Sequence, residues 1–165
     1  MDYPKCKIFL TRSEIAMSLQ MGLKDISFRE KTAWAMVIVL IAGGFFYFDK
    51  VVSLSRATGE TAPPIIGFVI AYVILIVIAS VIVMTVLSVA AGKEADQPAD
   101  EREKIISDKA GNWSSYVLTV PALGALWHYS VSMDGNMLFH LIFLSLMLSQ
   151  IFEYVFQIFL YRRGV

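Results

Sequence analysis

An acidic residue stands inside the last long apolar stretch of the sequence. Glu153 is followed four positions later by Gln157 and preceded three positions earlier by Gln150, so the three side chains share one face of a helix. A carboxylate inside a membrane costs a few kcal/mol unless it is protonated, paired or hydrated. Two interpretations stay open: a proton or cation site, or polar groups that hold helices together. Ser115 and Thr119, at comparable depth in the preceding stretch, are the predicted partners.

Two histidines flank the polar turn that precedes this stretch. His128 comes shortly before residues 133–136 and His140 shortly after them, so an antiparallel hairpin would bring both imidazoles to a similar depth. Together with Asp134 they could bind a metal ion, and the two imidazoles alone could flank a haem. No third nitrogen or sulfur ligand accompanies them. We therefore expect no cofactor and keep a haem or metal site as an alternative.

Other kinds of chemistry find little support in the sequence. There is no Ser/His/Asp set, no phosphate-cradling glycine loop and no pair of acids within one apolar stretch, so the sequence favours a protein that is not an enzyme. Cys6 is the only cysteine, which excludes a disulfide within one chain. A net charge of zero gives no basic field for nucleic acid.

These side chains must be positioned by helices that cross a bilayer. The 165 residues are 57% apolar, more than a soluble domain of this size can bury. Residues 65–91 contain no charge and exceed the length of about 18 residues that marks a span. We predict a single integral membrane domain over residues 1–165, with four spans at about residues 28–50, 63–92, 112–132 and 137–161.

The distribution of lysine and arginine predicts the orientation of these spans. Twelve lie before the first span, between the second and third, or after the fourth: Lys5, Lys7, Arg12, Lys24, Arg29, Lys31, Lys93, Arg102, Lys104, Lys109, Arg162 and Arg163. Only Lys50 and Arg56 lie on the opposite side. By the positive-inside rule, both termini are expected in the cytoplasm. Aromatic residues near the expected interfaces fit this placement: Trp34, Tyr47, Trp113 and Tyr161.

Local patterns mark where helices begin. A cap residue followed three positions later by glutamate occurs at Thr11, Ser27 and Asp100, and Thr61 before two prolines is a fourth expected start. The first pattern opens an amphipathic helix over residues 12–24. Its apolar face would lie on the cytoplasmic membrane surface or contact a partner, and it includes Ile15, Leu19 and Leu23.

Two further patterns concern how the helices associate. The tripeptide Arg-Glu-Lys precedes the first span at residues 29–31 and the third span at residues 102–104, which chance or a duplicated hairpin would explain. Small residues permit close helix approach at Gly43 and Gly44 in the first span and at Gly67 in the second.

The charged segment before the third span has a second point of interest. ADEREKIISDKAGNWSSYVL, residues 99–118, resembles a signature of an uncharacterised family of small prokaryotic four-span membrane proteins: an acidic DERE start, a Lys-Ala pair, then a span. The resemblance implies a fold but no activity. Its exposed charges, with Glu101, Arg102 and Lys104, are candidates for contact with a partner.

Taken together, the sequence predicts an all-α membrane protein: a four-helix transmembrane bundle with a cytoplasmic amphipathic helix at its start. We expect it to lie in the cell membrane as a non-catalytic accessory or regulatory subunit that forms a homo-oligomer or binds a membrane protein. The alternatives are a small proton-coupled transporter that uses Glu153 and a haem- or metal-binding protein that uses His128 and His140.

Overall fold

The computed structural model of the chain describes residues 27–92, 98 and 100–163, which form helices and turns. The helices are α2 (Phe28–Thr58), α3 (Ile66–Ala91), α4 (Glu101–Ser132) and α5 (Gly135–Arg163). The helical class is therefore confirmed for this part of the chain. The amphipathic helix predicted over residues 12–24, with Ile15, Leu19 and Leu23, lies outside the described residues.

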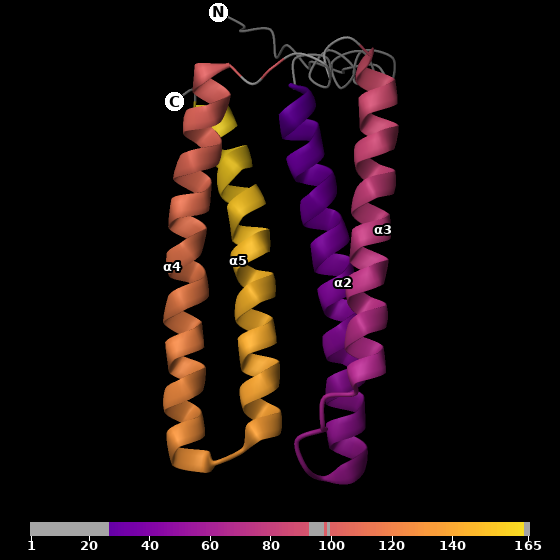
Figure 1. Ribbon diagram of the computed structural model, residues 1–165, viewed down its shortest axis with the longest axis vertical. Helices are drawn as coiled ribbons and strands as arrows, with labels where there is room; N and C mark the ends of the chain where they lie inside the picture. The colour runs from indigo at the N-terminus through magenta and orange to yellow at the C-terminus, as the bar shows by residue number, and fades with distance from the viewer. Residues whose placement is uncertain (1–26, 93–97, 99, 164–165) are drawn as a thin grey trace, which may run out of the picture.

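The four helices form two antiparallel hairpins that pack side by side (Figure 1). One hairpin joins α2 to α3 and the other joins α4 to α5, while α2 and α5 form the main contact between the hairpins. The helices therefore follow one another in the order α4, α5, α2, α3, with α3 and α4 on the outside. Both hairpin turns lie at one end of the molecule, which we call the turn end; the start of α2 and the end of α5 lie at the opposite end.

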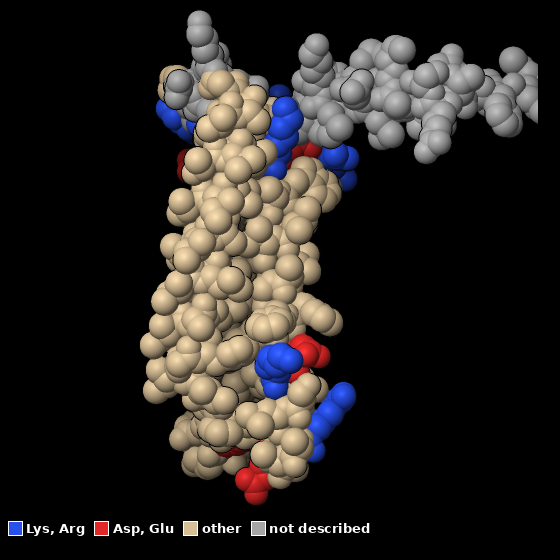
Figure 2. All heavy atoms as spheres, turned by 90° about the vertical axis from the view of Figure 1, so that its right-hand side faces the viewer, with Lys and Arg blue, Asp and Glu red and all other residues tan. Residues whose placement is uncertain are grey.

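Three of these helices, α2, α3 and α5, are long and apolar enough to cross a membrane, and they indicate a membrane protein. On the face shown in Figure 2, the charged side chains lie near the two ends and a broad uncharged band separates them. Among the described helices, α4 is the one whose mean hydropathy falls below that of a membrane span. The reason is its composition, because Trp113, Ser115, Tyr116 and His128 interrupt its aliphatic residues.

The starts of α2 and α4 follow from their cap residues. Ser27 Oγ accepts a hydrogen bond from the backbone N–H of Glu30, and Asp100 forms a complete capping box with Glu103. The Ser27 pattern is only half formed, because the Glu30 side chain pairs with Arg162 on α5 instead of returning to the cap. Both predicted starts are confirmed.

One predicted helix start at the turn end is wrong. Helix α2 continues past the predicted end of its span, near residue 50, to Thr58, since Asp49 and Lys50 point to its exposed surface and do not interrupt it. Helix α3 begins at Ile66 without a side-chain cap. Thr61, the expected cap, instead donates a hydrogen bond to Asp134 at the start of α5.

The paired glycines of α2 are the point where α2 meets both neighbours. A Cβ atom on Gly43 would lie 2.6 Å from Ile76 Cδ1 and 3.1 Å from the Tyr72 ring, both on α3. On Gly44 it would collide with the end of Met147 on α5. Close approach through this pair is therefore confirmed. At Gly67 the prediction is wrong, because a Cβ atom there would meet open space.

Candidate functional site

His140 lies in the interface between α2, α5 and the α2–α3 turn. It is 5% exposed, and its Nε2 atom lies 2.9 Å from the carbonyl oxygen of Ala62. Because a carbonyl can only accept, Nε2 carries the proton, and Nδ1 accepts a hydrogen bond from the Tyr47 hydroxyl at 3.2 Å. Both ring nitrogens are thus engaged in holding three segments together.

Tyr47 is the aromatic centre of the same interface. Although its position in the sequence placed it at the membrane boundary, it is only 1% exposed and packs against Phe68, Tyr72 and Phe143. Its ring is therefore enclosed by helices, and its predicted depth near a membrane interface stays a prediction. Its hydroxyl reaches His140 from the facing helix, a pairing that no spacing in the sequence reveals.

Asp134 organises the start of α5 and ties it to the other hairpin. Its Oδ1 atom accepts from the backbone N–H groups of Asn136 and Met137, and its Oδ2 atom accepts from the Thr61 hydroxyl at 2.7 Å. Asn136 completes the link by donating its side-chain amide to the carbonyl of Thr61. These bonds, led by the one from Met137, hold the pKa of the Asp134 carboxyl below its ordinary value.

The three predicted ligands do not converge on one point. His128 is exposed on α4, where its Nδ1 atom lies 3.2 Å from Ser132 Oγ, whereas His140 is buried between α2 and α5. Over residues 27–92, 98 and 100–163, no group of three or more His, Cys, Asp or Glu is placed to hold a metal ion. The haem or metal hypothesis gains no support from this geometry.

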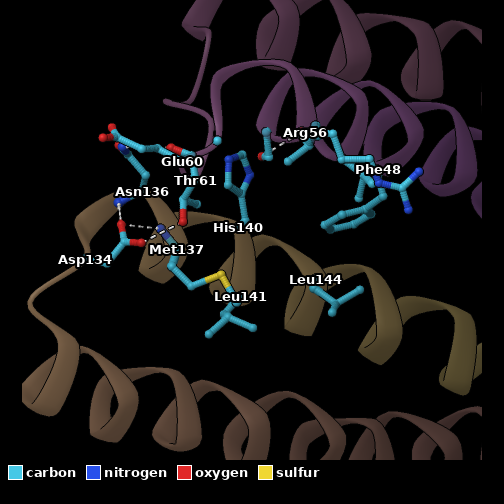
Figure 3. A pocket seen from close by; sticks show the side chains of 14 residues that line it. Phe48, Arg56, Glu60, Thr61, Asp134, Asn136, Met137, His140, Leu141 and Leu144 are labelled. Carbon is cyan, nitrogen blue, oxygen red and sulfur yellow. Dashed lines mark hydrogen bonds between the residues drawn. The ribbon is translucent and has the colours of Figure 1, made fainter.

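A cavity of about 860 Å³ lies beside His140 at the turn end. Its walls come from the end of α2, the α2–α3 turn and the start of α5 (Figure 3). Polar side chains gather near the turns, with Glu60, Asp134 and Asn136, while Leu141 and Leu144 continue the wall along α5. The cavity is therefore amphipathic along its length.

The sequence predicts that Gln150, Glu153 and Gln157 form one polar face of α5. The surroundings of these three residues differ from those of the turn-end cavity. Glu153 is partly buried and makes no hydrogen bond or ion pair within the part of the chain that the structure describes. Gln150 is exposed, and Gln157 lines a cavity of about 140 Å³ with Tyr154 and Glu103. Glu153 is thus an acid without a hydrogen-bond or ion-pair partner among the described residues.

Its predicted partners on α4 are engaged elsewhere. Ser115 Oγ donates to the carbonyl of Gly111, and Thr119 Oγ1 donates to the carbonyl of Ser115, so both bonds stay within α4. A buried hydrogen bond does join α4 to α5, from Ser149 Oγ to the carbonyl of Ser114 at 2.9 Å, and both serines are buried. Only the register of the two helices distinguishes Ser114 from Ser115, and the sequence does not show it.

The other end of the molecule is joined by charges. Arg29 Nε on α2 lies 2.8 Å from Glu103 Oε2 on α4, and Arg162 Nε on α5 lies 3.2 Å from Glu30 Oε1 on α2. Arg102 donates to the carbonyl of Tyr161 on α5. The two Arg-Glu-Lys tripeptides thus lie together and contribute to one set of contacts.

These contacts change which charged residues of segment 99–118 are available to a partner. Arg102, a predicted partner contact, is used within the chain, while Glu101 and Lys104 are exposed as expected.

Comparison with known proteins gives no match to a family model, a curated protein or a solved structure. The similarity of residues 99–118 to small prokaryotic four-span proteins therefore stays a prediction.

Proposed function

We propose that this chain is a non-catalytic subunit of the cell membrane that crosses the bilayer four times and acts by binding a membrane protein partner. The path of the chain supports the fourth span. Helix α3 ends at the same end of the molecule where α4 begins, and α5 begins at the turn end. If α2, α3 and α5 cross the bilayer as they stand, only α4 can carry the chain back across. Its 32 residues extend about 48 Å, more than the hydrocarbon layer requires.

The charges support an orientation with the turn end outside. Arg29, Arg102, Arg162 and Arg163 gather at the end opposite the turns, whereas Lys50 and Arg56 are the basic residues of the described turn end. By the positive-inside rule, the arginine-rich end faces the cytoplasm.

The unpartnered carboxylate of Glu153 is the observation that carries the proposed role. A charged or protonated acid in a span is stable only with a polar partner or water, and no described residue supplies the partner. Gln150, exposed one turn away, extends the polar surface outward from the helix pair. A polar group on a helix of another subunit, or of a second copy of this chain, would satisfy both side chains.

Purification from native membranes in a mild detergent tests this role. We expect one membrane protein to co-purify in stoichiometric amount, and Glu153→Leu to lower its recovery several-fold. Such a loss corresponds to an interhelical polar contact of about 0.5–2 kcal/mol. Val155→Leu, at an exposed position of the same helix, is the matched control and should leave recovery unchanged. Absence of any stoichiometric partner, or equal recovery with Glu153→Leu, would contradict the proposal.

A small proton-coupled transporter is the second candidate, and one observation favours it. Gln157 lines the cavity of about 140 Å³ near the cytoplasmic end, and water in this cavity would lie about one helical turn from Glu153. Under this hypothesis, Glu153→Gln abolishes proton-linked uptake in proteoliposomes and Glu153→Asp retains part of it. Uptake that is equal in wild type and Glu153→Gln removes this candidate.

A further inference from the structure

The cavity of about 140 Å³ lies between the helices at the end opposite the turns. All four described helices contribute to its wall, in chain order through Thr32, Met84, Ser107 and Gln157. Tyr154 and Tyr161 also line it, and their separation of seven residues corresponds to about 10 Å along α5. The cavity therefore extends from the helix ends toward the middle of the molecule.

The wall carries polar groups that no other described residue uses. The side chains of Ser107, Tyr154 and Gln157 form no hydrogen bond within the described part of the chain. In that part, no side-chain nitrogen or oxygen is both buried and without a hydrogen-bond partner. The unpartnered hydroxyl and amide groups are therefore accessible to a molecule the size of water.

An ion pair lies at the entrance of the cavity. Arg29 Nε and Glu103 Oε2 are 2.8 Å apart, and both residues line the cavity from the first turns of α2 and α4. Tyr161 lines it from the last turn of α5, at the same end of the molecule. The route from this end into the cavity therefore passes the ion pair.

We propose that this cavity is a water-filled vestibule that is entered past the pair of Arg29 and Glu103. At about 30 Å³ for each molecule, a volume of about 140 Å³ has room for about four waters. These waters form hydrogen bonds with Ser107, Tyr154 and Gln157, and they lie about one helical turn from Glu153. The vestibule supplies the water that the transporter candidate requires, and it does not rest on partner binding at Glu153.

The lining favours water over a lipid chain or an ion. An acyl chain would leave the hydroxyl and amide groups of the wall without hydrogen-bond partners, which is costly away from water. Arg29 and Glu103 are the charged residues among the described residues of the wall, and they pair with each other. An ion would therefore lose its hydration shell without gaining an uncompensated charge of opposite sign.

Thiol reactivity tests whether water fills the cavity. In a Cys6→Ser background, Gln157→Cys places a thiol in the wall, while Val155→Cys and Phe159→Cys place thiols at exposed positions of α5 that do not line the cavity. A thiol reacts as the thiolate, which is stable in contact with water and not in lipid. When sulfonatoethyl methanethiosulfonate is added to permeabilised cells, we expect position 157 to react at least about tenfold faster than either control.

The two controls separate access of water from depth in the membrane. Position 157 lies between positions 155 and 159 along α5, so a rate set by depth alone would fall between theirs. Such an intermediate rate, or a rate below both, would overturn the proposal. Equal labelling of the three variants after denaturation is the control for intact thiols, and elution in detergent at the position of the wild type is the control for folding.

Removal of both charges tests the entrance. Arg29→Gln combined with Glu103→Gln abolishes the ion pair without leaving an isolated charge, and glutamine can replace glutamate in the capping box of α4. We expect the reaction at position 157 to become several-fold faster. Glu101→Gln combined with Lys104→Gln, at exposed positions of the same turn of α4 outside the cavity, is the matched control and should leave the rate unchanged.

A rate at position 157 that stays the same without the ion pair, or that rises equally in the control, would overturn the assigned entrance. None of these rates depends on a second protein. Co-purification with Glu153→Leu tests partner binding separately, so a failure of the vestibule leaves that proposal intact.

Discussion

Different kinds of interaction hold the helices together at the two ends of the molecule. At the turn end, buried and largely uncharged groups join α2 to α5, with His140 and Tyr47 at 5% and 1% exposure. At the end opposite the turns, the ion pair of Arg162 with Glu30 does so, and the side chain of Arg162 is 62% exposed. Hydrogen bonds shielded from water are costly to leave unmade, whereas exposed ion pairs contribute little and are screened by salt. The turn end should therefore dominate the stability of the helix pair.

The sharpest way to break this comparison is to remove the buried imidazole. His140→Ala leaves the Ala62 carbonyl and the Tyr47 hydroxyl without their partner and should lower the free energy of unfolding by about 2–3 kcal/mol. His128→Ala, at the exposed histidine of α4, should change it by no more than about 0.5 kcal/mol. Denaturant titration in detergent micelles measures both, and comparable losses would refute a special role for the buried site.

The next largest effect is expected where α2 meets α3. Gly43→Ala places a methyl group against the rigid Tyr72 ring and should destabilise the protein by about 1–2 kcal/mol. Gly124→Ala is the matched control, because a Cβ atom there meets open space and alanine favours a helix. The same titration should show that control unchanged or slightly more stable. Equal destabilisation by both would contradict the close approach at Gly43.

A smaller and salt-dependent effect is expected at the end opposite the turns. Arg162→Gln removes the pair with Glu30 and should cost about 0.5–1 kcal/mol at low ionic strength, a value limited by the exposure of the arginine. Raising the salt concentration should shrink the difference from wild type. Arg56→Gln, which removes an arginine without an ion pair among the described residues, should show no such salt dependence. A salt-independent loss at Arg162 would place the contribution in packing instead.

The smallest expected effect is on the stability of the folded protein at low pH. Because the pKa of Asp134 is lower in the folded state, its carboxylate contributes stability that is present above the ordinary carboxyl pKa and is lost as the pH falls through the folded value. Asp134→Asn should remove that part of the acid sensitivity. Thermal unfolding of both proteins at neutral pH and near pH 3 should therefore show a smaller drop for the variant. An equal drop would show that Asp134 does not contribute.

Local sequence patterns predicted the helix starts of the fold better than the contacts of the candidate site. The caps at Ser27 and Asp100 were predictable because each bonds to a residue three positions away. Contacts between distant helices were not, because they depend on register. Ser149 bonds to Ser114 rather than Ser115, and Thr61 reaches Asp134 instead of capping its own helix. The sequence identified polar residues that could form bonds between helices. Helix packing determines which of these residues meet.

Accessibility of single cysteines tests most directly the claim that four spans place both described chain ends on one side. In a Cys6→Ser background, Glu60→Cys and Met133→Cys mark the two turns, and Lys109→Cys and Arg163→Cys mark the opposite end. We expect a membrane-impermeant maleimide to label positions 60 and 133 in intact cells and positions 109 and 163 only after permeabilisation. Labelling of 60 and 163 in intact cells, with 109 and 133 labelled only after permeabilisation, would show that α4 does not cross and would contradict the account.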